Sequence, residues 1–379
     1  MKGNNMIYLD YAANTPACEE VIQGFVECEH RFPMNPNSNN PLAKPAKDML
    51  EDAKNRIARV LKIKPNEMIF TSSGTESNNL AIKGIAAEHG ARKKHIITSF
   101  LEHSSTLGPI GELEKQGFEI DYVQLDPTGK IDFEHFQSLL REDTLLVALC
   151  EVDSEVGILQ DIHMLSKYIK EHSDALVHID GTQAVGKVPI HLEYVDSYTF
   201  SGHKIYGLNG IACLVLKESV IIEPLHHGGL SISPYRSGTP SLSLIDSLAR
   251  ALSLLETKRE ANYTYVESLR KELIDFFENY NQVRINSTQA SIPFITNITL
   301  IDIKAEEMKN QLAEKGFFLS TKSACSSPYA PSRAVYALTK DKKGARSTLR
   351  ISLSHLTTRD ELDAFKEIFD KELRSFNHE

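Results

Sequence analysis

The sequence predicts an α/β protein, with a mostly parallel sheet covered by helices on both faces and a smaller α+β region after it. Two observations lead to this prediction. The first two-thirds of the chain alternates strand-like and helix-like segments, which is typical of parallel sheets with helices on both faces. The chain also has 379 residues, enough for two domains rather than one.

The segments of the first region have the periodicity of their class. Residues 46–61 carry apolar side chains at helical spacing, and residues 75–87 form a second predicted helix. The predicted strands are residues 68–71, 95–98, 144–150, 176–179 and 195–200. Residues 211–216 are predicted to return antiparallel to them. Ligands of such sheets bind at the carboxyl ends of the strands, so the residues that follow these strands are candidates for a site.

We expect a large domain of residues 15–255 and a small domain of residues 1–14 and 256–379. A long helical stretch, roughly residues 242–280, joins the two. The expected elements of the small domain are residues 295–300, 305–315, 348–353 and a final helix from Arg359. The small domain also carries the segment around Cys325.

The composition argues against two classes of partner. A net charge of −9 disfavours nucleic acid binding by bulk electrostatics. No apolar run is long enough to span a bilayer, and residues 1–5 are too polar for a signal peptide. The five cysteines are scattered in a pattern that fits neither a disulfide framework nor a zinc site. We therefore expect a cytoplasmic protein with no metal, no membrane and no direct nucleic acid partner.

Two residues that follow predicted strands indicate a site for pyridoxal 5'-phosphate (PLP). Lys204 ends the motif Ser201-Gly202-His203-Lys204, and a lysine amine can form a Schiff base with an aldehyde cofactor. Asp180 lies shortly before it, and a buried aspartate can keep a pyridine nitrogen protonated. Lys204 alone would be explained as a solvent-exposed lysine at a strand end. The pair, in this order, predicts PLP.

The segment Ser72-Ser73-Gly74-Thr75 joins a predicted strand to a predicted helix. Glycine allows close backbone approach, and a helix N-terminus offers free N–H groups to a phosphate. The alternative for Gly74 and Thr75 is an ordinary helix N-cap. Ser201 and His203 are further phosphate donors on this interpretation, and otherwise belong to a turn after a strand.

Two more residues are candidates around the cofactor ring. His103 follows a predicted strand, where an imidazole can stack on the ring or move protons; the alternative is a plain loop residue. Gln183 is placed to hydrogen-bond the ring hydroxyl, or is a polar residue in the first turn of a helix.

Cys325 differs from the other cysteines in its surroundings. It lies in a small, polar segment near Lys322, whereas Cys150 and Cys213 lie in apolar runs. A thiolate nucleophile needs exposure and a positive environment. Cys325 is therefore a candidate nucleophile, and the alternative is an incidental exposed thiol.

Arg350 and Asn35 are candidate contacts for a carboxylate-bearing substrate. Arg350 alternates with apolar residues on a predicted strand, and a guanidinium there can bind a carboxylate through two hydrogen bonds or form a structural salt bridge. Asn35 precedes a proline, which also suits a simple turn. The basic turn at residues 236–239 can reach a phosphate, across a dimer interface in one interpretation, or be a solvated loop.

Over nearly its full length, from residues 7–16 to 349–353, the chain resembles the class V aminotransferase family, and within it cysteine desulfurases of the NifS/IscS type. The motifs that carry the resemblance are residues 201–204, Asp180 with Gln183, Glu102-His103, residues 236–239 and Ser323-Ala324-Cys325. The resemblance implies the PLP-dependent transferase fold type I. It also implies a homodimer in which Thr239 contacts the cofactor phosphate of the partner subunit.

The chain departs from the family pattern in two places. Asp153 and Ser154 stand where the family usually has two asparagines. Ser154 replaces a side chain expected near the cofactor hydroxyl and the substrate carboxylate, and Asp153 adds a possible negative charge. Residues 39–41 lack a histidine often found there. These changes bear on substrate affinity and rate more than on cofactor binding.

The resemblance implies a cysteine desulfurase that converts L-cysteine to L-alanine. Lys204 removes the Cα proton, His103 transfers protons, and the Cys325 thiolate takes the sulfur as a persulfide for a sulfur-acceptor protein of iron–sulfur cluster assembly or tRNA thiolation. Three alternatives stay open. An aminotransferase or a selenocysteine lyase of the same fold would keep Lys204 without needing Cys325. A weakly active PLP-binding scaffold protein is motivated by Asp153 and Ser154.

Overall fold

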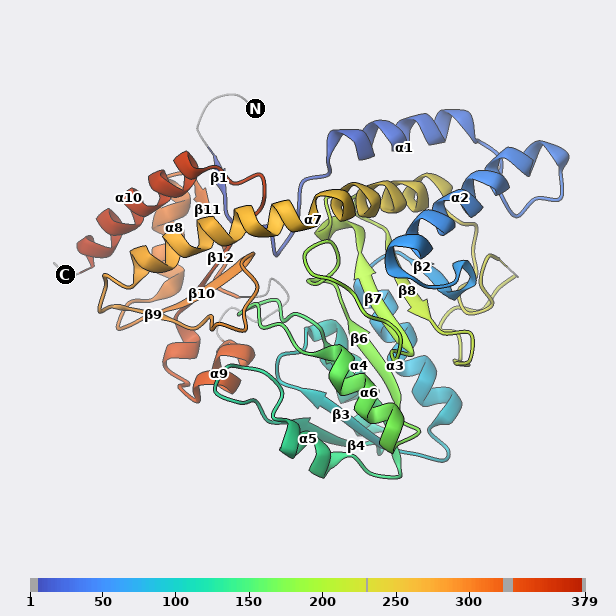
Figure 1. Ribbon diagram of the computed structural model, residues 1–379, viewed down its shortest axis with the longest axis horizontal. Coiled ribbons are helices and arrows are strands. Elements are labelled where there is room, and N and C mark those ends of the chain that lie inside the picture. Colours follow the sequence, from blue (N-terminus) through green and yellow to red (C-terminus); the bar gives the residue numbers. More distant parts are fainter. Residues whose placement is uncertain (1–5, 230, 323–329, 377–379) are drawn as a thin grey trace.

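The structure is a computed structural model that describes residues 6–229, 231–322 and 330–376 (Figure 1). Its largest element is a seven-stranded sheet with the strand order β2-β8-β7-β6-β5-β3-β4. The strands are β2 (Met68–Thr71), β3 (His95–Ser99), β4 (Glu119–Val123), β5 (Thr144–Cys150), β6 (Leu176–Asp180), β7 (Ser197–Ser201) and β8 (Ala212–Leu216). Strand β8 pairs antiparallel with both of its neighbours, and the other neighbouring pairs are parallel. The antiparallel return predicted for residues 211–216 is confirmed.

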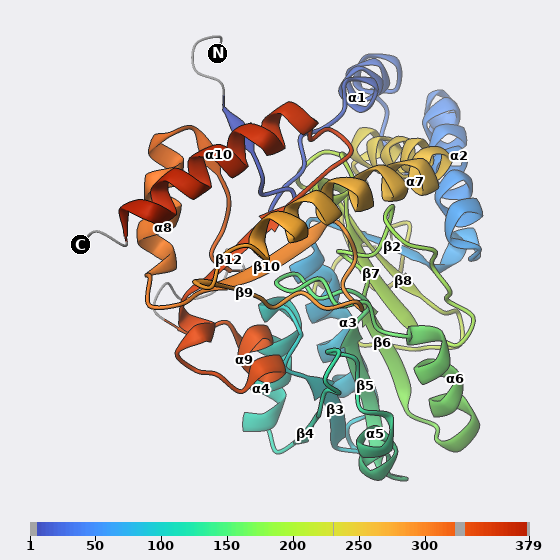
Figure 2. The same ribbon diagram turned by 60° about the vertical axis from the view of Figure 1, so that its left-hand side comes forward.

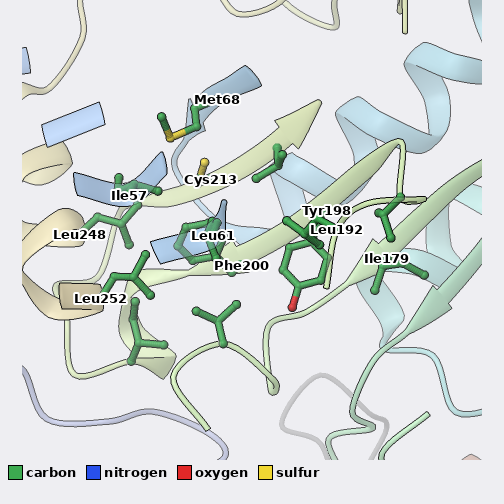
Figure 3. Close-up of a cluster of buried hydrophobic side chains, with 14 of the residues drawn as sticks. Ile57, Leu61, Met68, Ile179, Leu192, Tyr198, Phe200, Cys213, Leu248 and Leu252 are labelled. Carbon is green, nitrogen blue, oxygen red and sulfur yellow. The ribbon is translucent and has the colours of Figure 1, made fainter. Parts of the chain in front are cut away.

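Helices cover both faces of this sheet. Val147 and Leu149 of β5 join one hydrophobic cluster, whereas Leu146 and Ala148 join another, because successive side chains of a strand point to opposite faces. The first cluster takes in α1, α2, α5, α6 and the first half of α7, and the second takes in α3 and α4. These helices are α1 (Glu19–Arg31), α2 (Lys44–Leu61), α3 (Gly74–His89), α4 (Ser104–Lys115), α5 (Phe133–Leu139), α6 (Ile162–His172) and α7 (Leu242–Phe277). Figure 3 shows part of the first cluster, where Tyr198 and Phe200 of β7 pack with side chains of α2 and α7.

A second group of elements consists of the C-terminal part of the chain together with β1 near the N-terminus. Its three-stranded antiparallel sheet has the order β12-β10-β9, and β1 pairs parallel with β11. The strands are β1 (Ile7–Tyr8), β9 (Val283–Ile285), β10 (Ile295–Leu300), β11 (Phe317–Phe318) and β12 (Thr348–Ser352). The helices are α8 (Ala305–Glu314), α9 (Arg333–Thr339) and α10 (Arg359–Ser375). Short 3₁₀ turns lie at Pro41–Ala43, Pro65–Glu67, Gly202–Lys204 and Gly344–Arg346.

Helix α7 connects the two groups, as Figures 1 and 2 show. Its first half, including Leu248 and Leu252, packs in the cluster of the large sheet, and its second half, including Leu269 and Phe277, packs in the cluster of the C-terminal elements. The predicted fold class is therefore confirmed: a mostly parallel α/β sheet with a smaller antiparallel sheet after it. The domain boundary at residue 255 stays a prediction. None of the helices in the described ranges has an apolar stretch long enough to cross a bilayer.

Candidate functional site

A cavity of about 220 Å³ opens at the edge where β2, β3, β5, β6 and β7 end. These strands run in the same direction, so their carboxyl ends bring distant parts of the sequence together. Residues 12–13 and β12 close the cavity from the side of the smaller sheet. The lining residues are Ala12, Ala13, Ser73, Gly74, Thr75, Leu101, His103, Ser105, Cys150, Val152, Asp153, Ser154, Asp180, Thr182, Gln183, Ser201, His203, Lys204 and Arg350. Ten of the predicted site residues are among them.

Lys204 reaches this cavity from the 3₁₀ turn that follows β7. Its Nζ atom donates hydrogen bonds to the carbonyl oxygens of Ala12, at 2.7 Å, and Ala13, at 2.5 Å. The N-terminal segment is fixed to the same turn, because Thr15 donates its N–H to the carbonyl of His203 at 2.8 Å. The amine is thus held at the cavity wall by backbone acceptors.

Asp180 is oriented by a buried hydrogen-bond network. Its Oδ2 atom accepts a hydrogen bond from Nδ2 of Asn78 at 2.7 Å, and its Oδ1 atom accepts one from the N–H of Thr182 at 3.0 Å. The Oδ1 atom of Asn78 lies 3.1 Å from Nε2 of His178. Burial lowers the pKa of His178 to about 4, so the imidazole is neutral and donates through Nε2. Every polar atom of the Asn78 amide is therefore used to hold Asp180 in place.

The turn after Asp180 is built on a small residue for a steric reason. A Cβ atom at Gly181 would lie 1.9 Å from the ring of Tyr198, so only glycine leaves room for that ring. The hydroxyl of Tyr198 donates to Oε2 of Glu151 at 2.5 Å, and the N–H of Glu151 donates to the carbonyl of Asp180 at 3.0 Å. Burial raises the pKa of Glu151 to about 7. The backbone of Asp180 is therefore held by a second buried polar pair, Tyr198 and Glu151.

The N-terminus of α3 and the end of β7 form a cradle for an anion. Helix α3 begins at Gly74, and a Cβ atom there would lie 2.9 Å from Oγ of Ser201. That Oγ atom is buried and has no hydrogen-bond partner among the described residues. Thr75 and His203 complete this wall. An unpartnered hydroxyl beside free helix N–H groups is suited to bind a phosphate oxygen.

These features together fit PLP. The cavity offers an amine for the aldehyde group, a carboxylate for the ring nitrogen and an anion cradle for the phosphate. The three lie at the ends of β7, β6 and β2, at one edge of one sheet.

His103 caps the N-terminus of α4 and lines the same cavity. Its Nδ1 atom accepts a hydrogen bond from the N–H of Ser105 at 3.1 Å. Burial lowers the pKa of His103, and the nearby positive charge of Lys204 also acts in that direction. A neutral imidazole with Nδ1 as the acceptor carries its proton on Nε2.

Gln183 is buried and has both ends of its amide occupied. Its Nε2 atom donates to the carbonyl of Ala12 at 2.8 Å, and its Oε1 atom accepts from Nζ of Lys187 at 2.8 Å. Burial lowers the pKa of Lys187 to about 7, and Lys204 and Arg350 add to the effect. The lysine thus fixes the amide with its nitrogen toward Ala12.

Arg350 lines the cavity from β12 of the smaller sheet and is only 1% exposed. One Nη atom donates to Oδ1 of Asp10 at 2.7 Å, and the other donates to the carbonyl of Ser154 at 2.8 Å. Its Nε atom is buried and has no partner among the described residues.

The two residues that depart from the family pattern have different roles in the structure. The Asp153 carboxylate accepts hydrogen bonds from the N–H groups of Glu155, Val156 and Ile158 at 2.7–2.8 Å. Burial raises the pKa of Asp153 to about 6. Asp153 thus holds its own turn together while lining the cavity. Ser154 contributes its backbone carbonyl to Arg350 and a short side chain to the cavity wall.

Two predicted site residues that the structure describes, Asn35 and Thr239, do not line this cavity. Asn35 is exposed, and its side chain accepts the N–H of Asn37 at 2.9 Å, as in a simple turn. Thr239 is also exposed. In the same turn, Arg236 donates to Glu76 of its own chain at 3.1 Å. Cys325 lies outside the described residues.

The sequence analysis did not identify Asn78, Lys187 or Asp10. Asn78 is a fully buried polar residue on α3, and burial was its only available signal. Lys187 lies four positions after Gln183, within a run of turns at residues 182–187 that is not a helix. Asp10 contacts Arg350 across 340 positions of sequence, so no local pattern could have found that pair.

Known proteins match this chain over nearly its whole length. The model of the family described as aminotransferase class-V matches residues 7–365. The cysteine desulfurase IscS of Pseudoalteromonas translucida is 35% identical over 370 residues, covering 94% of this chain and 90% of that protein.

Two solved structures are also similar. A NifS-like protein has a TM-score of 0.91 at 30% identity, covering 97% of this chain and 99% of its own. The structure of SspA in complex with cysteine has a TM-score of 0.81 at 30% identity, covering 93% of this chain and 100% of its own. The family match and this coverage lead to one conclusion: the chain belongs to the class V aminotransferase family.

Proposed function

We propose that this protein is a PLP-dependent cysteine desulfurase. It would convert L-cysteine to L-alanine and pass the sulfur through a persulfide on Cys325 to an acceptor protein of iron–sulfur cluster assembly or tRNA thiolation. The observation that carries the proposal is the convergence of Lys204, Asp180 and Arg350 on one cavity. Relatives named cysteine desulfurase and a similar structure in complex with cysteine support the choice of substrate.

The residues around the cavity have separate tasks in this reaction. Lys204 would hold PLP, which when bound supplies an electron sink for negative charge at the substrate Cα. Lys204 then removes the Cα proton, and Asp180 keeps the ring nitrogen protonated. Arg350 binds the substrate carboxylate. His103 transfers protons near the substrate sulfur.

Sulfur transfer is a nucleophilic displacement at the substrate sulfur. The Cys325 thiolate forms an S–S bond as the Cβ–S bond of the substrate breaks. The electron pair of the broken bond stays with carbon, which takes up a proton and leaves as alanine. The acceptor must then remove the outer sulfur of the persulfide. The position of Cys325 in the sequence motif is the basis for this role.

Two further parts of the proposal concern assembly and location. A homodimer would explain why Thr239 is exposed in the single chain, since it would contact the cofactor phosphate of the partner subunit. The scattered cysteines agree with a cytoplasmic location, since each of the four described cysteines is free.

The test is a paired assay of alanine and protein-bound persulfide after incubation with PLP and L-cysteine. We expect equal amounts of both in a single turnover. Replacing Cys325 with serine should leave the cofactor absorbance unchanged and abolish persulfide. Cys18→Ser, at the one cysteine among the described residues that is not buried, should leave both products unchanged.

Other outcomes would redirect the proposal. Persulfide at the normal level in Cys325→Ser would exclude Cys325 as the nucleophile. Consumption of a keto acid would indicate an aminotransferase, and turnover of selenocysteine alone would indicate a lyase. Cofactor binding without any turnover would favour the scaffold role.

A further inference from the structure

Two groups fix the guanidinium of Arg350 before any substrate binds, and a third fixes its backbone. Asp10 accepts from one Nη atom, the carbonyl of Ser154 accepts from the other, and the backbone of Arg350 donates its N–H to the carbonyl of Ser320 at 2.6 Å. A guanidinium has five N–H donors in a rigid plane. Fixing two of them by separate acceptors determines where the other three point.

Asp10 is itself held on both sides. Its second carboxylate oxygen accepts from the hydroxyl of Ser320 at 2.7 Å, and Tyr8 donates its hydroxyl to the Asp10 carbonyl at 3.0 Å. The segment of Asp10 also bridges to Ser352 of β12, the strand that carries Arg350. Asp10 is therefore a rigid acceptor rather than a loose surface carboxylate.

The Nε atom of Arg350 is a donor that remains for a ligand. It is buried and has no partner among the described residues, and leaving a buried donor unpaired is costly. Arg350 lines the cavity, so a ligand there is the available acceptor. A carboxylate can bind a guanidinium through two parallel hydrogen bonds, one of them from Nε.

We propose that Asp10 is a positioning residue, which orients the Arg350 guanidinium so that its Nε edge binds the carboxylate of an amino acid substrate. The inference rests on the proposed function for the identity of that substrate. Asp10 does not touch the substrate; it acts through Arg350.

The test measures binding as well as turnover. The PLP-loaded protein is titrated with L-alanine, the proposed product, and with L-alaninamide, which lacks the carboxylate, and the change in cofactor absorbance gives both dissociation constants. For Asp10→Ala we expect the constant for L-alanine to rise about 10-fold or more, and that for L-alaninamide to stay within about 2-fold. KM for L-cysteine should rise in parallel while kcat falls less.

Two further variants separate orientation from charge and from folding. Asp10→Asn keeps an acceptor for Nη, so we expect L-alanine binding to stay within about 3-fold of wild type. Ser320→Ala frees only the second oxygen of Asp10 and should weaken L-alanine binding about 2- to 5-fold. Ser320→Ala also serves as the readout should Asp10→Ala fail to fold.

Three results would overturn the inference. They are equal weakening for L-alanine and L-alaninamide, unchanged L-alanine binding in Asp10→Ala, and equal weakening in Asp10→Asn and Asp10→Ala. Failure of the proposed function looks different: the wild-type protein would then bind no PLP, or would bind L-alanine without producing it from L-cysteine.

Discussion

The cavity has an Asp180 end, which the large sheet forms, and an Arg350 end, on β12 of the smaller sheet. The two ends differ in how far hydrogen bonds within the protein pair their polar groups. At the Asp180 end, each carboxylate oxygen accepts one hydrogen bond, from Asn78 and from Thr182, and His178 fixes the amide of Asn78. At the Arg350 end, a buried Nε donor has no partner among the described residues. The first end, which we call closed, has a carboxylate that the protein holds in place and that can still accept from a ring nitrogen. The second, which we call open, has a donor that the described residues leave unpaired.

This difference matches what the proposed reaction asks of each end. A group that keeps a bound cofactor protonated must not move during turnover, and a closed network of buried hydrogen bonds provides that rigidity. A group that binds and releases a substrate needs donors that are oriented but not used up.

The largest effect is expected at the closed end. Asp180→Asn keeps the size of the side chain but removes the charge that stabilises a protonated ring nitrogen. Alanine formation should fall about 10²- to 10³-fold, while Lys204 still binds PLP and gives its absorbance. A single-turnover assay measures the rate. A loss of less than about 5-fold would show that Asp180 is only structural.

A smaller effect is expected at the open end. Arg350→Lys retains the positive charge but cannot make two parallel hydrogen bonds or reach Ser154 and Asp10 together. KM for L-cysteine should rise about 10- to 100-fold, with kcat less affected. Steady-state kinetics at several L-cysteine concentrations separate the two constants. An unchanged KM would remove Arg350 from the substrate site.

Predictability from sequence also differs between the two ends. Lys204 and Asp180 could be identified because Asp180 ends β6 and Lys204 lies in the turn after β7, and parallel strands bring their carboxyl ends to one edge. The residues that hold Lys204 and Asp180 in place could not be identified from the sequence. Asn78 is a polar residue inside a helix, and its contact with Asp180 spans 102 positions.

At the Arg350 end, prediction from sequence was limited because the deciding contacts are between residues far apart in the chain. The sequence analysis left open whether Arg350 binds substrate or forms a structural salt bridge, and the structure shows a salt bridge to Asp10 together with an unpaired Nε. Asp153 lines the cavity, and its three backbone hydrogen bonds depend on a turn that no periodicity predicts.

Ser154 offers a gain of function at the open end. Ser154→Asn restores the side chain that the family usually has there, and adds one donor beside Arg350. We expect KM for L-cysteine to fall about 2- to 10-fold, the value of one hydrogen bond. Ser154→Ala is the control and should change KM less than 3-fold. A rise of KM in Ser154→Asn would mean that the cavity has no room for the longer side chain.

Glu151, whose N–H donates to the carbonyl of Asp180, is where we expect the smallest effect on catalysis. Its effect on stability should be measurable. Burial raises the pKa of Glu151 from 4.5 to about 7, so the folded state binds a proton that the unfolded state has lost between these pH values. The stability that Glu151 contributes is thus complete below pH 4.5 and is lost as the pH rises through 7. Glu151→Gln keeps an acceptor for Tyr198 and does not ionise.

Urea unfolding at pH 5 and pH 8 measures this difference. The loss of unfolding free energy between the two pH values should be smaller in Glu151→Gln than in wild type, by on the order of 2 kcal/mol. Other groups that titrate in this range affect both proteins alike, so the comparison isolates Glu151. Equal losses in the two proteins would mean that the Glu151 carboxyl is solvated. Water would then reach the polar groups next to Asp180 more easily than their hydrogen bonds indicate.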